Sequence, residues 1–182
     1  MRCRCRSGLG LPGPAGSATA RPGLVGSDSR RIAEVTLDEH TVLRRSPDIE
    51  HERAVAIVDL LKENSFAPAS GREGPFRLHL AIKENRLHLE IGSQADGSSE
   101  TVVLPLGPFR GIVKDYFILC ESYYAATRRA GLAQIEALDV GRRSLHDEGS
   151  ALLCERLGDR VAIDHDTARR LFTLICVLHL RG

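Results

Sequence analysis

The stretch whose residue types are best suited to catalysis or ligand binding is 141–149, where an arginine, a histidine and acidic side chains lie close together in the sequence. If this stretch is one continuous helix, Arg142 lies in the middle of its leucine-rich face and His146 lies one turn away, at the edge of that face. An arginine that faces a core either pairs with a carboxylate or lines a cavity. If the helix instead ends at Gly141, this glycine caps it and Arg142 is a loop residue. The sequence leaves the loop, the ion pair and the ligand site open.

A ligand site in this stretch would bind an anion, because an arginine can hold a carboxylate or phosphate through two hydrogen bonds. His146 could act as a general base with Glu148 or Glu121 as its partner, and His146 and Glu121 are the candidate catalytic residues. All three tyrosines lie on one face of one predicted helix, so Tyr116 and Tyr123 join Arg142 as candidate ligand-binding residues. The competing interpretation is core packing, with the tyrosine hydroxyls bonded to partners such as Arg142.

The sequence indicates no metal site and no cofactor. His51 has no second ligand three or four residues further on, and His79 and His88 fall on the polar face of a predicted hairpin, where a solvated pair is the simpler interpretation. Residues 28–182 contain no GxGxxG, Walker A, GxSxG, HExxH or CxxC motif. The five cysteines are odd in number and mostly lie in apolar helical patterns, which fits a reducing cytoplasm.

Strand patterns predict an antiparallel meander. Residues 76–82 and 86–91 alternate cleanly between apolar and polar side chains, and the three residues between them suit a hairpin turn. Residues 101–106 predict a third strand. Shorter strands are expected at 30–37 and 161–164. The apolar members of the hairpin share one face, as expected for a sheet that is buried on one side only.

Helical patterns account for most of the remaining chain. A helix is expected from Ser46-Pro47-Asp48 to about Asn64, with Ala54, Ile57, Val58 and Leu61 as its buried stripe. Further helices are expected at 108–130, at 132–157 and after an Asp164 or Asp166 cap. The last helix is apolar on every side and should be central and buried. The predicted fold class is α+β, a meander of three or more strands packed on four to five helices.

The first 27 residues differ from the rest of the chain. They carry four arginines and no acid, together with six of the 17 glycines and three of the eight prolines. We expect either a disordered tail or a misassigned start, with Val25 as the initiator, followed by a single domain over 28–182. That domain has 21 basic and 24 acidic side chains, a balance that does not favour nucleic acid or anionic lipid. Its longest apolar run, about eight residues, is far shorter than a membrane span.

Four long segments resemble a known family. They read SPDIEHERAVAIVDLLKENSF (46–66), GPFRGIVKDYFILCESYY (107–124), GRRSLHDEGSALLCERL (141–157) and DTARRLFTLICVLHLRG (166–182). The chain from about residue 28 onward is similar to a family of small proteobacterial proteins that is described only as an uncharacterised protein family. The resemblance implies no reaction, cofactor or catalytic residue.

Two functions of different classes follow from the sequence. The first is a non-catalytic cytoplasmic binding or regulatory protein with an unknown protein partner, because catalytic motifs are missing and Ile118 points away from the core face of its helix. The alternative is an enzyme that acts on a small anionic molecule through an Arg, His, Glu and Tyr site. Neither function involves a membrane, nucleic acid is disfavoured, and the oligomeric state stays open, a homo-oligomer included.

Overall fold

The computed structural model describes residues 28–38, 47–129 and 131–179. The expectations for residues 1–27 and for a cap at Ser46 lie outside these ranges. The helices are η1 (Asp28–Arg30), α1 (Pro47–Lys62), η2 (Gly107–Phe109), α2 (Arg110–Arg129), α3 (Leu132–Leu157) and α4 (His165–His179). The strands are β1 (Ile32–Leu37), β2 (Phe66–Pro68), β3 (Phe76–Lys83), β4 (Arg86–Ser93), β5 (Ser99–Pro105) and β6 (Val161–Ile163).

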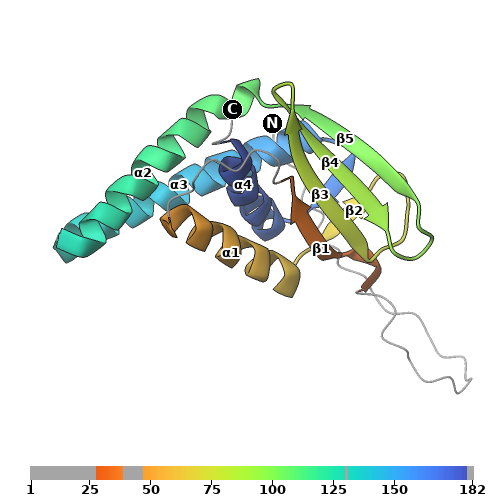
Figure 1. The fold of residues 1–182 in the computed structure, drawn as a ribbon, viewed down its shortest axis with the longest axis horizontal. Coiled ribbons are helices and arrows are strands. Elements are labelled where there is room, and N and C mark those ends of the chain that lie inside the picture. The colour runs from red at the N-terminus through yellow and green to blue at the C-terminus, as the bar shows by residue number, and fades with distance from the viewer. Residues whose placement is uncertain (1–27, 39–46, 130, 180–182) are drawn as a thin grey trace, which may run out of the picture.

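The described residues form an α+β fold, as predicted, with a four-stranded sheet against a layer of four α-helices (Figure 1). The strand order is β1-β3-β4-β5, and β3, β4 and β5 form the expected meander. The sheet is nevertheless mixed, because β1 runs parallel to β3. A parallel pair needs a crossover connection, and α1 lies in that connection. A further two-stranded sheet, in which β2 pairs with β6, was not predicted.

The β3–β4 hairpin follows the predicted alternation. Leu80 faces Leu89 across the pair, and both are buried. Glu84 and Asn85 take positive φ angles of 51° and 58°, which makes a two-residue turn with the twist that hairpins prefer. On the other face His79 lies opposite Glu90 and its Nδ1 is 2.8 Å from Thr36 Oγ1. The hairpin histidines therefore do not face each other directly.

The buried stripe predicted for α1 is only partly right. The buried residues are Ala56 and Leu60, whereas Val58 is 63% exposed and Ala54 is also exposed. Ile57 and Leu61 pack at the edge of the core. Residues 54–58 are all apolar, so the periodicity alone does not distinguish the buried side of this helix from the exposed one.

Helix α4 is the central helix of the layer, as predicted. Its residues 171–178 are all buried, and it contacts both α1 and α3 (Figure 1). Asp164 caps it, because one carboxylate oxygen accepts a hydrogen bond of 2.7 Å from the Thr167 backbone N–H. A helix covered on every side can be apolar all round, which explains the composition of α4.

Helix α3 runs without a break through Gly141, which decides the question that the sequence left open. A Cβ atom at Gly141 would lie 3.0 Å from the Leu119 side chain of α2. A Cβ atom at Gly149 would lie 2.3 Å from the ring of Phe172 on α4. Both glycines therefore allow close helix packing, and at Gly149 the approach leaves no room for any side chain.

We predict that Gly149→Ala destabilises the protein by about 2 kcal/mol, because the methyl group would push a fully buried Phe172 ring out of place. Gly141→Ala is the matched control in the same helix. It meets a flexible leucine end and gains helix propensity, so its free energy of unfolding should stay close to that of the wild type. Urea denaturation measures both, and equal stability of the two variants would contradict the packing described above.

Candidate functional site

Arg142 of α3 forms an ion pair with Glu52 of α1. Its Nη1 lies 3.1 Å from Glu52 Oε1, and its Nη2 lies 3.3 Å from Asp139 Oδ1 one turn earlier in α3. The Arg142 side chain is 25% exposed and that of Glu52 is 17% exposed. Of the three interpretations of Arg142, the structure shows the ion pair. The guanidinium is held by two carboxylates and links α3 to α1.

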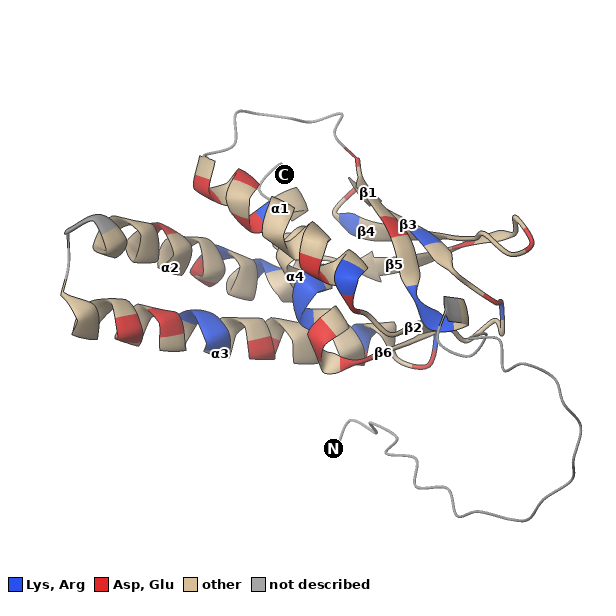
Figure 2. Cartoon of the chain, turned by 90° about the horizontal axis from the view of Figure 1, so that it is seen from below, with Lys and Arg blue, Asp and Glu red and all other residues tan. Residues whose placement is uncertain are grey.

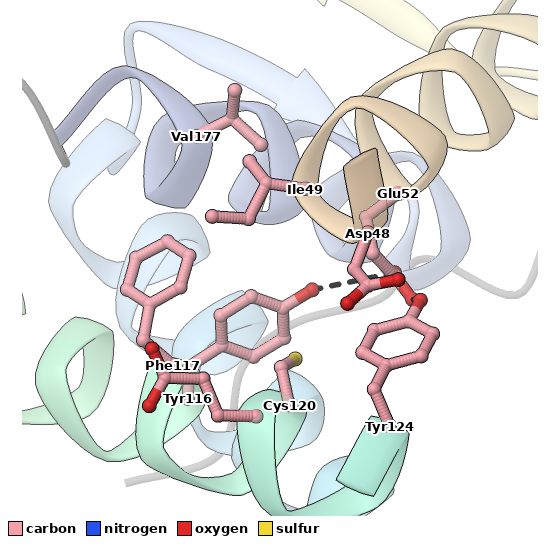
Figure 3. Close-up of a pocket in the computed structure, with 9 residues that line it drawn as sticks. Asp48, Ile49, Glu52, Tyr116, Phe117, Cys120, Tyr124 and Val177 are labelled. Carbon is pink, nitrogen blue, oxygen red and sulfur yellow. Dashed lines mark hydrogen bonds between the residues drawn. The ribbon is translucent and has the colours of Figure 1, made fainter. Parts of the chain in front are cut away.

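Glu52 accepts further hydrogen bonds from α2. The Tyr124 hydroxyl donates to Oε1 at 2.6 Å, and the Tyr116 hydroxyl lies 3.4 Å from Oε2 (Figure 3). The Arg142 guanidinium carbon lies 5.1 Å from the centre of the Tyr123 ring, within the range of a cation–π contact. Arg142 and the three tyrosines thus lie in one cluster, and two of the tyrosine hydroxyls contact a carboxylate of α1.

Sequence analysis missed Glu52 as the centre of this cluster. The acidic side chains at the start of α1 suit the helix dipole, and that role explained them sufficiently. The available signal was spacing. Glu52 precedes Ala56 by one turn and Leu60 by two turns, so it lies on the face of α1 that these two residues bury.

His146 of α3 is packed inside the helical layer. Burial, together with the nearby charges of Arg169 and Arg142, lowers its pKa to about 4. Its Nε2 lies 3.2 Å from Thr173 Oγ1, and its ring centre lies 5.2 Å from that of Tyr116. At neutral pH the imidazole is therefore uncharged and is a weak base.

Glu121 lies on an exposed position of α2. Within the described ranges no hydrogen bond or ion pair joins it to His146. The proposed acid–base pair of His146 and Glu121 is therefore not assembled in this structure. A catalytic role for His146 and Glu121 stays a prediction from the sequence.

A cavity of about 30 Å³ lies where α1, α2 and α4 meet, which is room for about two water molecules. The carboxylates of Asp48, Glu52 and Glu121 line it together with two tyrosines, a phenylalanine, two aliphatic side chains and a thiol. The full lining is Asp48, Ile49, Glu52, Tyr116, Phe117, Cys120, Glu121, Tyr124 and Val177 (Figure 3). Of the predicted site residues only Tyr116 and Glu121 are among them. Arg142, His146 and Tyr123 are not.

The thiol and the two phenols that line the cavity are protonated at neutral pH, whereas a nucleophile would need to be ionised. Burial raises the pKa of Cys120 to about 11 and raises the pKa of Tyr116 and Tyr124 well above the usual value. The hydrogen bond to Glu52 adds to the effect at Tyr124. A thiol or phenol in this state is not an activated nucleophile at neutral pH.

A serine, a histidine and an aspartate meet at the junction of α3 and α4. His165 Nδ1 lies 3.5 Å from Ser150 Oγ, and its Nε2 lies 3.3 Å from Asp147 Oδ1. Ser150 is completely buried, and its hydroxyl donates to the Asp147 carbonyl at 3.0 Å. A nucleophilic serine must be open to substrate, so this trio joins two helices and does not form a catalytic triad.

The described residues contain neither a cluster of metal ligands nor a helix that could cross a membrane. No group of three or more His, Cys, Asp or Glu side chains there is arranged to hold a metal ion. Among the helices of the same residues, none has the length and apolar composition to cross a membrane.

Comparison with known proteins gives the family. The profile of the uncharacterised protein family UPF0262 matches residues 29–181. The chain belongs to the UPF0262 family. A UPF0262 protein of Rhodospirillum rubrum is 57% identical over 155 residues, which cover 85% of this chain and 96% of the relative. The UPF0262 proteins of Azorhizobium caulinodans and Rhizobium etli are 56% and 53% identical over 156 and 152 residues, 84% of this chain in each case and 95% and 96% of the relatives. No solved structure matches the chain significantly.

We predict that Arg142→Met destabilises the protein by about 3 kcal/mol, because the Glu52 carboxylate then loses its charged partner in a mostly buried place. Adding Glu52→Gln should restore most of the loss. Arg143→Met is the control, since Arg143 is exposed and should change the free energy of unfolding by no more than about 0.5 kcal/mol. Urea denaturation of the four proteins tests this, and a normal stability of Arg142→Met would contradict the ion pair.

We predict that His146 contributes to acid sensitivity. Its pKa in the folded protein, about 4, lies below its ordinary value of 6.5, so the unfolded chain binds more protons between these values. Stability should fall as the pH drops from about 6.5 to about 4, by up to about 3 kcal/mol from this group. His146→Gln should flatten this part of the profile, whereas His51→Gln, at an exposed position, should retain it. Denaturation at a series of pH values measures the difference.

Proposed function

We propose that this protein is a non-catalytic cytoplasmic binding or regulatory protein that engages a protein partner through its helical layer. One observation carries the proposal. The side chains that could perform chemistry bond to one another, with Arg142 held by Glu52 and Asp139, and they leave a cavity for only about two waters. A site that turns over a substrate needs a cavity for it and an available acid or base.

Exposed apolar side chains favour the helical layer as the binding surface. Within the described residues, the large hydrophobic side chains that are exposed all belong to α1, α2 or α3. They are Val55, Val58, Ile118, Leu132 and Val140. The outer face of the sheet instead carries polar residues, among them Arg77, His79 and Glu90. Contiguous exposed apolar patches mark protein-binding surfaces, and the proposal is that these side chains contribute to such a patch.

The charge pattern supports a protein partner over a nucleic acid. Acidic and basic side chains are interspersed along α2 and α3 (Figure 2). Residues 28–182 carry three more acidic than basic side chains. A surface that tracks phosphates needs a continuous basic stripe. A second copy of this chain is one partner that the same surface would suit.

The alternative function, an enzyme for a small anion, gains no support from the geometry. The residue meant to hold the anion, Arg142, has two carboxylate partners and does not line the cavity. The cavity itself is lined by carboxylates. An anion in that place would be repelled by them.

Charge substitutions on the exposed apolar residues test the proposal. Tagged wild-type protein should recover a stoichiometric partner from the cells that make it, or form a dimer by light scattering. Val58→Glu or Val140→Glu should reduce that complex about tenfold while the melting temperature is unchanged. Gln134→Glu, an exposed polar position on α3, is the matched control and should bind as the wild type does. A monomer without a partner, or a complex that both glutamate variants retain, would contradict the proposal.

A further inference from the structure

The cavity between α1, α2 and α4 offers hydrogen-bond acceptors to its interior. Carboxylates are acceptors only, and three of them line it. The two tyrosine hydroxyls that line it both direct their protons to Glu52, which leaves their oxygen lone pairs (Figure 3). A molecule that enters must therefore supply the hydrogen-bond donors itself.

Glu52 retains capacity for another donor. A carboxylate has about four lone-pair positions. Oε1 accepts from Tyr124 at 2.6 Å and from Arg142 at 3.1 Å, whereas the described contact of Oε2 is the long one of 3.4 Å from Tyr116. A short hydrogen bond to Oε2 would replace or add to this weak contact, and Glu52 lines the cavity where such a donor would sit.

Charge and ring chemistry favour a cation as the donor. No lysine or arginine is among the described residues that line the cavity, and Glu121 adds a negative charge that Arg142 does not neutralise. The rings of Tyr116, Phe117 and Tyr124 form part of the wall (Figure 3). Aromatic faces attract cations, and organic ammonium groups are bound in this way more readily than strongly hydrated metal ions.

The size of the cavity restricts the cation further. A cavity of about 30 Å³ takes the ammonium group itself, and the carbon stem would extend past Glu121, whose position is exposed. We propose that this cavity binds the primary ammonium group of a small alkylamine, with Glu52 and Glu121 as counter-charges and the aromatic rings as the wall. The proposal is independent of the helical binding surface proposed above.

The test uses ethylammonium chloride and wild-type protein. Chemical shifts of the tyrosine rings are followed by NMR during titration, with potassium chloride at the same ionic strength and ethanol as a neutral analogue. A ligand of three heavy atoms is expected to bind with a Kd of about 1 mM. Saturable shifts with ethylammonium alone support the proposal. Equal shifts with potassium chloride, or none, overturn it.

Variants that keep the fold locate the site. Glu121→Gln and Phe117→Leu should each weaken ethylammonium binding about threefold to tenfold. Tyr124→Phe frees a Glu52 oxygen and retains the ring, so it should bind at least as tightly as the wild type. Glu136→Gln, at an exposed position of α3 outside the cavity, is the matched control and should have no effect. Wild-type affinity in both Glu121→Gln and Phe117→Leu would refute the site.

An ammonium group can come from a free amine or from a lysine side chain of another protein. Adding a short lysine-containing peptide, with blocked ends, to the same titration distinguishes these sources. Equal affinity for ethylammonium and the peptide identifies the ammonium group alone as the ligand. Binding of the peptide without ethylammonium would refute a free-amine site. If neither ethylammonium nor the peptide binds, the ammonium site is refuted. The helical binding surface is tested independently by Val58→Glu and Val140→Glu.

Discussion

A carboxylate in a mostly apolar interior needs a positive charge or hydrogen-bond donors beside it. The contacts that meet this need for Glu52 join three helices, α1, α2 and α3. Its oxygens take an arginine from α3 and two phenol hydroxyls from α2. Two side chains of α1, Ala56 and Leu60, are buried, and the contacts of Glu52 add polar links from this helix to α2 and α3. Helix α1 also lies in the crossover from β1 to β3, which connects the carboxylate to the parallel edge of the sheet.

The same compensation determines the protonation states around it. Burial raises the pKa of Tyr116 and Tyr124 above the usual value and the charge of Glu52 acts in the same direction, so both remain phenols that donate to Glu52. His146 packs against the Tyr116 ring and lies near the arginine that pairs with Glu52, so its protonation would add a positive charge beside an existing one. Groups that resemble acid–base machinery in the sequence are thus fixed in their neutral forms by the contacts that build the helical layer.

Local patterns predicted the elements that are amphipathic or buried on all sides. The hairpin, the third meander strand and the central α4 follow directly from periodicity. Strand β6 was expected at 161–164, whereas β2 has only three residues, too few for a periodic signal, and the β2–β6 pairing joins residues nearly 100 positions apart. The continuity of α3 through Gly141 depends on packing against Leu119, and the burial of Glu52 depends on which side of an apolar α1 meets the core. Such features are tertiary, and a single sequence does not encode them locally.

The ion pair with Glu52, which was not predicted from the sequence, changes the ligand chemistry that Arg142 implies. A lone arginine on a core face implies a positive pocket and hence an anionic ligand. Here Glu52 neutralises Arg142, Asp139 pairs with both Arg142 and Arg143, and the further carboxylate of Glu121 lines the cavity. The local charge is therefore negative on the cavity side, and the polar groups there accept hydrogen bonds. These groups suit a cationic ligand, whereas Arg142 alone suggests an anionic one. Arg142 pairs with carboxylates and supports the site without lining the cavity.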